Sequence, residues 1–149
     1  MKDELKDKFN IREYRESDYE SILGFWDITG MGSPERGDNK EIIKTTISMG
    51  GALIVMEEIA TGRVSGTSWM TYDGRRILLH HFGILPELQG NGLSKILLRH
   101  SLDFVKQKGC QVKLEVHSTN YKAINLYEKF GFRHLGAYYV FIIRDISNM

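Results

Sequence analysis

The chain carries the segment PELQGNGLSK at residues 86–95, in which two glycines lead directly into a helical pattern. Apolar and aromatic residues then recur at the spacing of one helix face up to Gly109, which is expected to end the helix. An apolar run over residues 77–85 precedes the segment, and Pro86 is expected to end that run as a strand. The segment therefore predicts a strand, a glycine turn and an amphipathic helix in succession.

The start of this helix has the features of an anion-binding site. A helix N-terminus presents unpartnered backbone N–H groups and partial positive charge, and glycine lets an anion approach the backbone closely. No acidic residue occurs between Leu88 and Leu102, whereas Lys95 and Arg99 are basic. A glycine-rich helix entry without a ligand fits the turn equally well. P-loop and dinucleotide motifs fit worse, because Lys-Ser/Thr does not follow Gly92 and Lys95 stands where a third glycine is required.

A second segment, NYKAINLYEKFGF at residues 120–132, follows the first along the chain. In this order the two segments resemble the acyl-CoA-binding core of the GNAT family of N-acetyltransferases, with the resemblance centred on residues 77–132. The family motif Gln/Arg-x-x-Gly-x-Gly/Ala is matched at Gln89, Gly92 and Ser94, although serine departs from the usual glycine or alanine. The resemblance implies an enzyme that transfers an acetyl group from acetyl-CoA, its cosubstrate, to a primary amine by direct attack, without a metal.

The resemblance also implies which residues bind acetyl-CoA. In the family, the amides of the glycine turn hold the pyrophosphate, and the end of the preceding strand pairs with the pantetheine arm. An asparagine at the start of the last helix contacts that arm, and a tyrosine lies beside the sulfur. The matching positions in this chain are Phe82, Gly83, Ile84, Gln89, Gly90, Asn91, Gly92, Leu93, Ser94, Lys95, Asn120 and Tyr127.

Tyr127 is the candidate general acid. The thiolate that leaves a thioester, with a thiol pKa near ~8.5, needs a proton or another form of stabilisation, and a phenol hydroxyl can donate that proton. The family places a tyrosine in this role at the position of Tyr127. Helical periodicity alone favours Tyr127 as an ordinary core aromatic of an amphipathic helix.

The general base has several candidates. Glu115 and His117 share one face of an expected strand, and Leu114-Glu115-Val116 is similar to the ribosomal-protein N-terminal alanine acetyltransferases, in which the matching glutamate acts through water. Glu115 is therefore the first candidate and His117 the second. His80 and His81 are adjacent on a strand, so they are expected to face opposite sides and to form no metal pair. A line of water without a dedicated base is the remaining alternative.

Turn residues and apolar periodicity predict the order of the elements. Strands are expected at residues 11–14, 52–59, 64–72, 77–85, 111–117, 132–135 and 138–144. Helices are expected from a capping box at Ser17–Glu20, over 40–48 with Asp38 or Asn39 as N-cap, from 93 to Gly109, and over 120–130. This order predicts one α/β domain over residues 1–149, with a single mixed sheet of about seven strands flanked by four helices. It is also the order of the GNAT-like acyl-CoA N-acyltransferase fold.

Composition argues against several classes of partner. Twenty basic against nineteen acidic residues give a net charge near +1, so no broad surface for nucleic acid is expected. Apolar runs are too short for a membrane span, and the charged residues 1–8 do not resemble a signal peptide. One cysteine excludes an internal disulfide. We therefore expect a cytoplasmic protein, and a homodimer agrees with the resemblance because many family members are dimers.

The acceptor amine is not specified by any motif. Residues 26–39 are rich in glycine and join the first two helices, and Trp26, Asp27, Glu35 and Asp38 are suited to a cationic amine, but they equally suit a solvated loop. A small-molecule amine and a protein N-terminus both remain candidate acceptors. Two other functions stay open, namely a non-catalytic acyl-CoA-binding sensor on the same fold and an unrelated phosphate-binding protein.

Overall fold

The computed structural model describes residues 2–149, which divide into two compact units, Met1–Glu115 and Val116–Met149. The first unit contains one five-stranded sheet with the strand order β1-β2-β3-β4-β5. The pairs β1–β2, β2–β3 and β3–β4 are antiparallel, and the pair β4–β5 is parallel. The strands are β1 (Phe9–Glu13), β2 (Ala52–Glu58), β3 (Val64–Tyr72), β4 (Arg76–Ile84) and β5 (Gln111–Leu114). That the two units form one domain stays a prediction.

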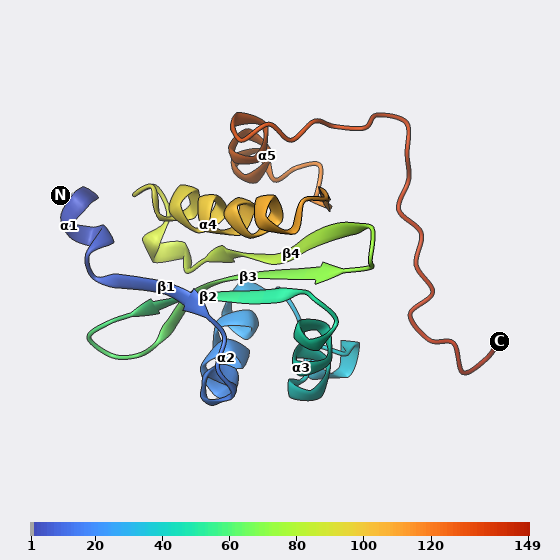
Figure 1. Cartoon of the computed structure of the whole chain (residues 1–149), viewed down its shortest axis with the longest axis horizontal. Helices are drawn as coiled ribbons and strands as arrows, with labels where there is room; N and C mark the ends of the chain where they lie inside the picture. Colours follow the sequence, from blue (N-terminus) through green and yellow to red (C-terminus); the bar gives the residue numbers. More distant parts are fainter. Residues whose placement is uncertain (1) are drawn as a thin grey trace. The chain divides into compact units, whose positions relative to one another are not determined.

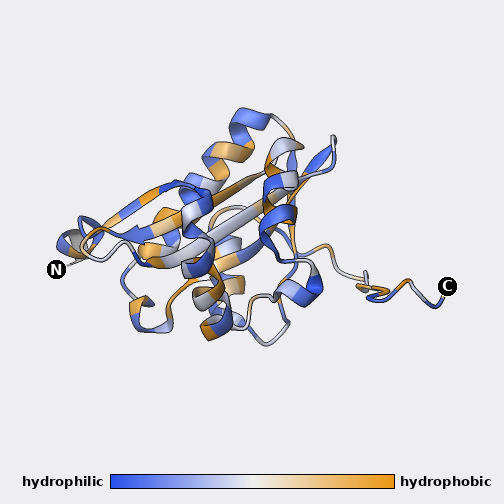
Figure 2. Cartoon of the chain, turned by 90° about the horizontal axis from the view of Figure 1, so that it is seen from below, coloured by the Kyte–Doolittle hydropathy of each residue, from blue (hydrophilic) through white to orange (hydrophobic). Residues whose placement is uncertain are grey.

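Helices cover both faces of this sheet. Helices α2 (Tyr19–Thr29) and α3 (Lys40–Ser48) lie on one face, and α4 (Leu93–Lys108) lies on the other (Figure 1). A short helix, α1 (Lys2–Lys6), precedes β1. Coloured by hydropathy, the helical ribbons alternate between hydrophobic and hydrophilic bands, as expected for helices with one face against a sheet (Figure 2). The predicted class, one mixed sheet flanked by helices, is confirmed.

The core on the α2 and α3 face is built from large side chains. Phe25 and Trp26 of α2 and Ile43 of α3 pack with β-strand residues that include Trp69, and all are buried. On the opposite face, Ser68 of β3 and Ser101 of α4 form a buried hydrogen bond of 2.6 Å. This bond satisfies two hydroxyl groups that would otherwise be buried without partners.

The predicted start of α3 agrees with the structure, whereas the predicted start of α2 does not. Asn39 caps α3, as predicted, because its Oδ1 accepts a hydrogen bond of 2.9 Å from the Ile42 N–H. The capping box predicted at Ser17–Glu20 is wrong. A turn of 3-10 helix over Glu16–Asp18 comes first, and the carboxylate of Asp18 instead accepts from the Arg15 N–H at 2.7 Å. Asp18 takes this position because it is also bound to Arg12.

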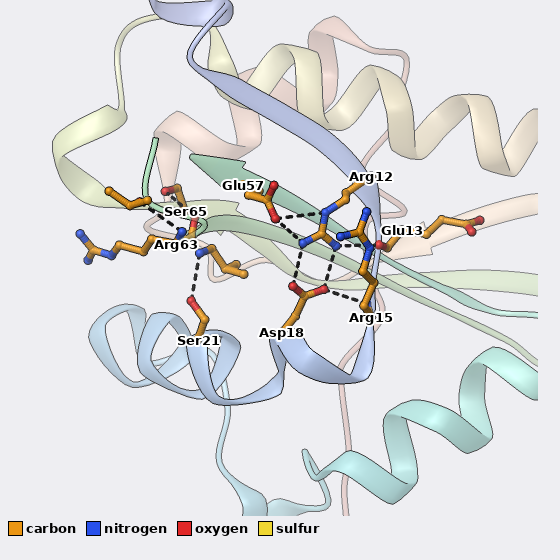
Figure 3. A network of polar contacts seen from close by, with 10 residues as sticks. Arg12, Glu13, Arg15, Asp18, Ser21, Glu57, Arg63 and Ser65 are labelled. Carbon is orange, nitrogen blue, oxygen red and sulfur yellow. Dashed lines mark hydrogen bonds and ion pairs between the residues drawn. The ribbon is translucent and has the colours of Figure 1, made fainter. Parts of the chain in front are cut away.

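Arg12, Asp18 and Glu57 form an ion network between β1, β2 and the start of α2 (Figure 3). Arg12 donates two hydrogen bonds to Asp18, of 2.7 and 2.8 Å, and also contacts Glu57. The Arg12 and Asp18 side chains are 12% and 7% exposed. Burial opposes the charge on Asp18, but the bonds from Arg12 and from the Arg15 N–H outweigh burial and hold the Asp18 pKa below its usual value.

Asp18→Asn is expected to lower the free energy of unfolding by about 3 kcal/mol, because Arg12 would be left buried without its bidentate partner. Glu16→Gln is the matched control, since the Glu16–Lys44 pair is exposed and 3.7 Å long, and a loss below about 1 kcal/mol is expected there. Urea denaturation at neutral pH measures both changes. Equal losses in the two variants would contradict a special role for the buried pair.

The Asp18 contribution is also expected to depend on pH. Because the folded-state pKa is lowered, the unfolded chain takes up the proton more readily than the folded protein does. The stabilisation is therefore complete above the ordinary carboxyl pKa near ~4 and is lost as the pH falls through the lower folded-state value. In Asp18→Asn this loss on acidification should be smaller.

The second unit contains helix α5 (Tyr121–Lys129), which Asn120 caps by accepting a 3.3 Å hydrogen bond from the Ala123 N–H. The strands predicted at residues 132–135 and 138–144 are absent, and the described chain after α5 contains no strand or helix. Their apolar side chains are exposed, for example Phe141 at 90%. A strand requires a partner ladder as well as a suitable pattern, and residues 132–144 form none. The sheet accordingly has five strands and not seven.

No helix among residues 2–149 has the length and apolar character needed to cross a bilayer.

Candidate active site

The glycine turn leaves β4 through one turn of 3-10 helix, Pro86–Leu88, and ends at the first residue of α4, Leu93. Gly90 and Gly92 have φ values of 85° and 83°, a region that residues with a Cβ rarely adopt. The glycines are thus required by the backbone of the turn itself. Asn91 stabilises the turn, since its Nδ2 donates to the carbonyl oxygens of Leu88 and Gln89 at 3.2 and 3.3 Å.

Six consecutive backbone N–H groups, from Gly90 to Lys95, donate to no other described residue. Helix α4 has neither a capping side chain nor an acidic residue in its first turn. A Cβ placed on Gly90 or Gly92 would meet no atom within 4 Å, so the space in front of the turn is open. The turn therefore fits an oxyanion such as a phosphate, which would accept from these N–H groups at the positive end of the helix dipole.

Beside the turn, the edge of β4 is only partly covered within the first unit. β4 pairs with β5 from Arg76 to Leu79, where the parallel ladder ends at Leu114. Beyond Leu79, β4 continues to Ile84 and pairs on its other side with β3, through Thr67↔Gly83 and Gly66↔Ile84. Within residues 2–115, no strand pairs with β4 on its β5 side beyond Leu79. A strand edge without a neighbouring strand is able to pair with an extended polar chain.

β4 contains one extra residue at His81. The register with β3 shifts between Thr67 and Trp69, and His81 has φ 45°, the only positive value at a non-glycine residue among those described. This bulge changes the direction of the side chain. Nδ1 of His80 and Nδ1 of His81 consequently lie 2.7 Å apart, on the same side of the strand. The prediction that these two histidines face opposite sides was wrong, because the alternation of a regular strand does not hold across a bulge.

Asp38 extends this pair of histidines. Nε2 of His81 lies 3.2 Å from Oδ1 of Asp38, within ion-pair distance although not aligned as a regular hydrogen bond. Oδ2 of Asp38 accepts from the Ser33 N–H at 2.9 Å, which fixes the carboxylate. Among the described residues, no group of three or more His, Cys, Asp or Glu side chains is arranged to hold a metal ion.

Burial keeps both imidazoles neutral near pH 7. Desolvation, helped by the neighbouring His81, lowers the pKa of His80 to about 4, and the carboxylate of Asp38 opposes this only in part. Desolvation also lowers the pKa of His81, again against the carboxylate of Asp38. Neutral imidazoles are proton acceptors, so the pair has the protonation state of a general base.

Two tryptophans pack around the histidines. Trp26 and Trp69 are stacked with ring centroids 5.5 Å apart, and His81 lies 4.7 and 5.0 Å from them. The indole of Trp26 donates to Thr67 Oγ1 at 3.0 Å, and that hydroxyl donates to the carbonyl oxygen of His81 at 2.6 Å. Neither contact was predicted from the sequence. The two adjacent histidines were the only feature of the sequence that could have indicated this cluster. The bulge that aligns their side chains arises from pairing with β3.

A hollow of about 310 Å³ lies next to this cluster, at the small end of the range for ligand sites. Trp26, Asp27 and Glu35 line it, as the sequence suggested for an acceptor region, together with Arg36. Gly32 also lines the hollow, and a Cβ there would overlap Asp38 and His81. The hollow and the histidine cluster therefore share Trp26 and Gly32.

Glu115, the first candidate for the general base, lies just after the end of β5 and is exposed. Strand β5 was expected to reach His117 but ends at Leu114, because the bulge in β4 ends the parallel ladder. His117 is in the second unit and is also exposed. Its Nδ1 accepts from the Thr119 N–H at 3.2 Å and lies 2.8 Å from the Thr119 hydroxyl. His117 thus organises the loop before α5.

Tyr127 lies on α5 with its ring edge-on to Phe132, at a centroid distance of 5.6 Å. Burial raises the pKa of its hydroxyl to about 12. The phenol is therefore protonated at any pH near neutrality and is able to donate a hydrogen bond or a proton. Asn120 caps the same helix through Oδ1, and this bond does not use its amide NH₂ group.

Comparison with known proteins places the chain among acetyltransferases. A profile of the Acetyltransferase (GNAT) family matches residues 10–132. An acetyltransferase of Sodalis glossinidius is 27% identical over 123 residues, which cover 82% of this chain and 85% of that protein. A crystal structure of a Trypanosoma brucei acetyltransferase shares the fold with a TM-score of 0.74 and 24% identity, covering 91% of this chain and 99% of that chain.

The likeness to the alanine acetyltransferases also has a structural counterpart. The ribosomal-protein alanine N-acetyltransferase of Escherichia coli shares the fold with a TM-score of 0.69 and 19% identity, covering 84% of this chain and 77% of that chain. The profile match spans most of the chain and includes both segments on which the resemblance was based. The chain belongs to the GNAT family of acetyltransferases.

Proposed function

We propose that the protein is an N-acetyltransferase that uses acetyl-CoA to acetylate a primary amine, carried either by a small molecule or by a protein N-terminus. The supporting observation is the run of unpartnered N–H groups from Gly90 to Lys95 at the start of α4. These groups offer a phosphate more donors than a helix start alone supplies. Family membership makes the pyrophosphate of acetyl-CoA the expected anion.

The remaining contacts to acetyl-CoA follow from the same placement. The amides from Gly90 to Lys95, with the side chain of Gln89, would hold the pyrophosphate. The β4 segment Phe82–Ile84 would pair with the amides of the pantetheine arm, and Asn120 would contact the same arm through its NH₂ group. Bound in this way, acetyl-CoA would supply a thioester carbonyl as the acetyl donor.

Acetyl transfer then requires two proton transfers. A base takes one proton from the amine as its nitrogen bonds to the acetyl carbon, and Glu115, acting through water, is one candidate. Tyr127 gives the other to the departing sulfur, for which its protonated phenol is suited. The function that competes with this proposal is a non-catalytic acyl-CoA sensor, which would need neither proton transfer.

Isothermal titration of the purified protein with acetyl-CoA, using ADP and AMP as controls, tests the binding half of the proposal. We expect a dissociation constant in the micromolar range for acetyl-CoA, about −8 kcal/mol, and clearly weaker binding of both nucleotides. If all three compounds bound alike, the turn would be a general phosphate site, and the enzyme assignment would be dropped.

Transfer is tested by release of free CoA in the presence of amines of different classes. Suitable acceptors are a polyamine, an aminoglycoside and a peptide with an N-terminal alanine, the last because of the structural neighbour that acts on such a residue. Turnover with any acceptor supports the enzyme. Tight binding of acetyl-CoA without turnover on any of them would favour the sensor.

A further inference from the structure

We propose that Asp38, His81 and His80 form a proton relay, in which Nε2 of His80 accepts the proton that the amine loses during acetyl transfer. This inference rests on the proposed function and assigns its general base. His80 is the catalytic residue in this proposal, whereas His81 and Asp38 act through it. The proposal is based on the arrangement of three side chains within the first unit.

The contacts favour one placement of the hydrogens on the two imidazoles. Only one of the two Nδ1 atoms, 2.7 Å apart, carries hydrogen when both imidazoles are neutral and bonded to each other. The carboxylate of Asp38, 3.2 Å from Nε2 of His81, favours a hydrogen on that nitrogen. Nδ1 of His81 is then the acceptor and Nδ1 of His80 the donor. Nε2 of His80, which bonds to no described residue, keeps a free lone pair.

The proton balance follows from these tautomers. The amine reacts in its neutral form, after its ammonium proton has gone to solvent. As the amine lone pair forms the bond to the acetyl carbon, an N–H bond breaks, its electron pair stays on nitrogen, and the proton moves to Nε2 of His80. His80 then passes its Nδ1 proton to Nδ1 of His81. The positive charge comes to rest on His81, beside the carboxylate of Asp38. The C–S bond breaks with its electron pair on sulfur, which takes a proton from Tyr127.

The relay is next to the part of β4 assigned to the pantetheine arm. His80 directly follows Leu79, the last β4 residue paired with β5, and the segment Phe82–Ile84 begins immediately after His81. Trp26 and Gly32 border both the relay and the neighbouring hollow, which is the candidate acceptor region.

A pair of histidines that only filled the core would require neither a strained backbone nor a buried carboxylate beside it. His81 is held at φ 45°, a strained value for a residue with a Cβ, and such strain is concentrated at functional sites. Asp38 is 13% exposed, and one of its oxygens is directed to His81 although the Ser33 N–H satisfies the other. A buried carboxylate without a role would raise the cost of folding.

Nuclear magnetic resonance tests the tautomers in the ligand-free protein. Long-range ¹H–¹⁵N correlations of protein labelled with ¹⁵N-histidine distinguish protonated from bare ring nitrogens, and His80→Asn and His81→Asn variants assign the signals. At pH 7 we expect hydrogen on Nδ1 of His80 and on Nε2 of His81. Hydrogen on Nε2 of His80 would overturn the proposal, because that atom would then have no lone pair to accept a proton.

Kinetics tests the catalytic role. In His80→Asn the amide nitrogen replaces Nδ1 as a donor to His81, but the base is lost, so kcat should fall by about 10²–10³-fold while acetyl-CoA affinity is unchanged. Glu115→Gln tests the competing base in the same assay. A fall in kcat for Glu115→Gln that exceeded the fall for His80→Asn would assign the base to Glu115 and overturn the relay. If the original protein acetylated no amine, the proposed function itself would fail.

The pH profile separates the positioning role of Asp38 from a purely structural one. His80 is lost as a base when it is protonated, so the acid limb of kcat, measured at saturating acceptor, should lie below pH 6, towards the pKa of about 4. The groups that act on His80 are His81 and Asp38. Asp38→Asn removes a charge that raises both histidine pKa values, and it should therefore move this limb to still lower pH. An unmoved limb would remove Asp38 from the relay.

Discussion

Tyr127→Phe is expected to lower kcat by about 10²–10⁴-fold and to leave the dissociation constant of acetyl-CoA nearly unchanged. The substitution removes one oxygen and keeps the ring that packs against Phe132. If Tyr127 donates the proton to sulfur, the loss affects only the step in which the C–S bond breaks. Single-turnover kinetics with acetyl-CoA, combined with a binding titration, separates the two effects.

Tyr121→Phe is the matched control for this prediction. Tyr121 lies on the same helix, its side chain is 70% exposed, and it has no proposed role. Loss of its hydroxyl should change neither kcat nor the unfolding temperature. Equal kcat values for Tyr127→Phe and the original protein would leave Tyr127 as a core aromatic. If Tyr127→Phe lowered the unfolding temperature strongly as well as kcat, the hydroxyl would be structural rather than catalytic.

Elements whose signals are local were predicted well from the sequence. The bounds of α3 at 40–48 and β3 at 64–72 agree with the structure, and Asn39 caps α3. An N-cap, a turn and an amphipathic period each depend on residues within one or two turns of each other. The glycine turn before α4 was predicted for the same reason. The structure adds that both glycines have positive φ values, which residues with a Cβ rarely adopt.

Features that depend on distant residues could not be predicted. Ser17 has the sequence of a capping residue, yet Asp18 is the residue that closes the turn. Arg12 of β1, which also contacts Glu57 of β2, fixes the Asp18 carboxylate. The bulge at His81 likewise arises from the register between β3 and β4. The contact between Arg12 and Asp18 decides where α2 begins. The register between β3 and β4 decides where the two histidine side chains point.

The same distinction applies to the ends of the sheet. Residues 138–144 have the β-branched and aromatic composition of a strand, but a strand forms only when another strand accepts its backbone hydrogen bonds. Glu115 was placed on a strand face by alternation, whereas β5 ends one residue earlier. For the candidate site, the sequence showed that two adjacent histidines lie on the strand before the glycine turn. Only the structure shows that the side chains of His80 and His81 contact each other.

Gly92→Val is expected to weaken acetyl-CoA binding by at least about a hundredfold, which corresponds to the loss of one or two hydrogen bonds to a charged group. The branched side chain would occupy the open space in front of the N–H groups at the start of α4, where the pyrophosphate is proposed to lie. Isothermal titration with acetyl-CoA measures the loss, and circular dichroism shows whether the variant is folded.

Backbone strain alone could lower affinity, and Gly62→Val controls for it. Gly62 has φ 73° against 83° for Gly92, and a Cβ at either position meets no atom within 4 Å. Valine should thus strain both turns to a similar extent, on the order of 1–3 kcal/mol. Gly62 lies in the turn between β2 and β3, away from the proposed cosubstrate contacts. Weak binding in Gly92→Val with normal binding in Gly62→Val would assign the pyrophosphate to the turn, whereas normal affinity in a folded Gly92→Val protein would refute that placement.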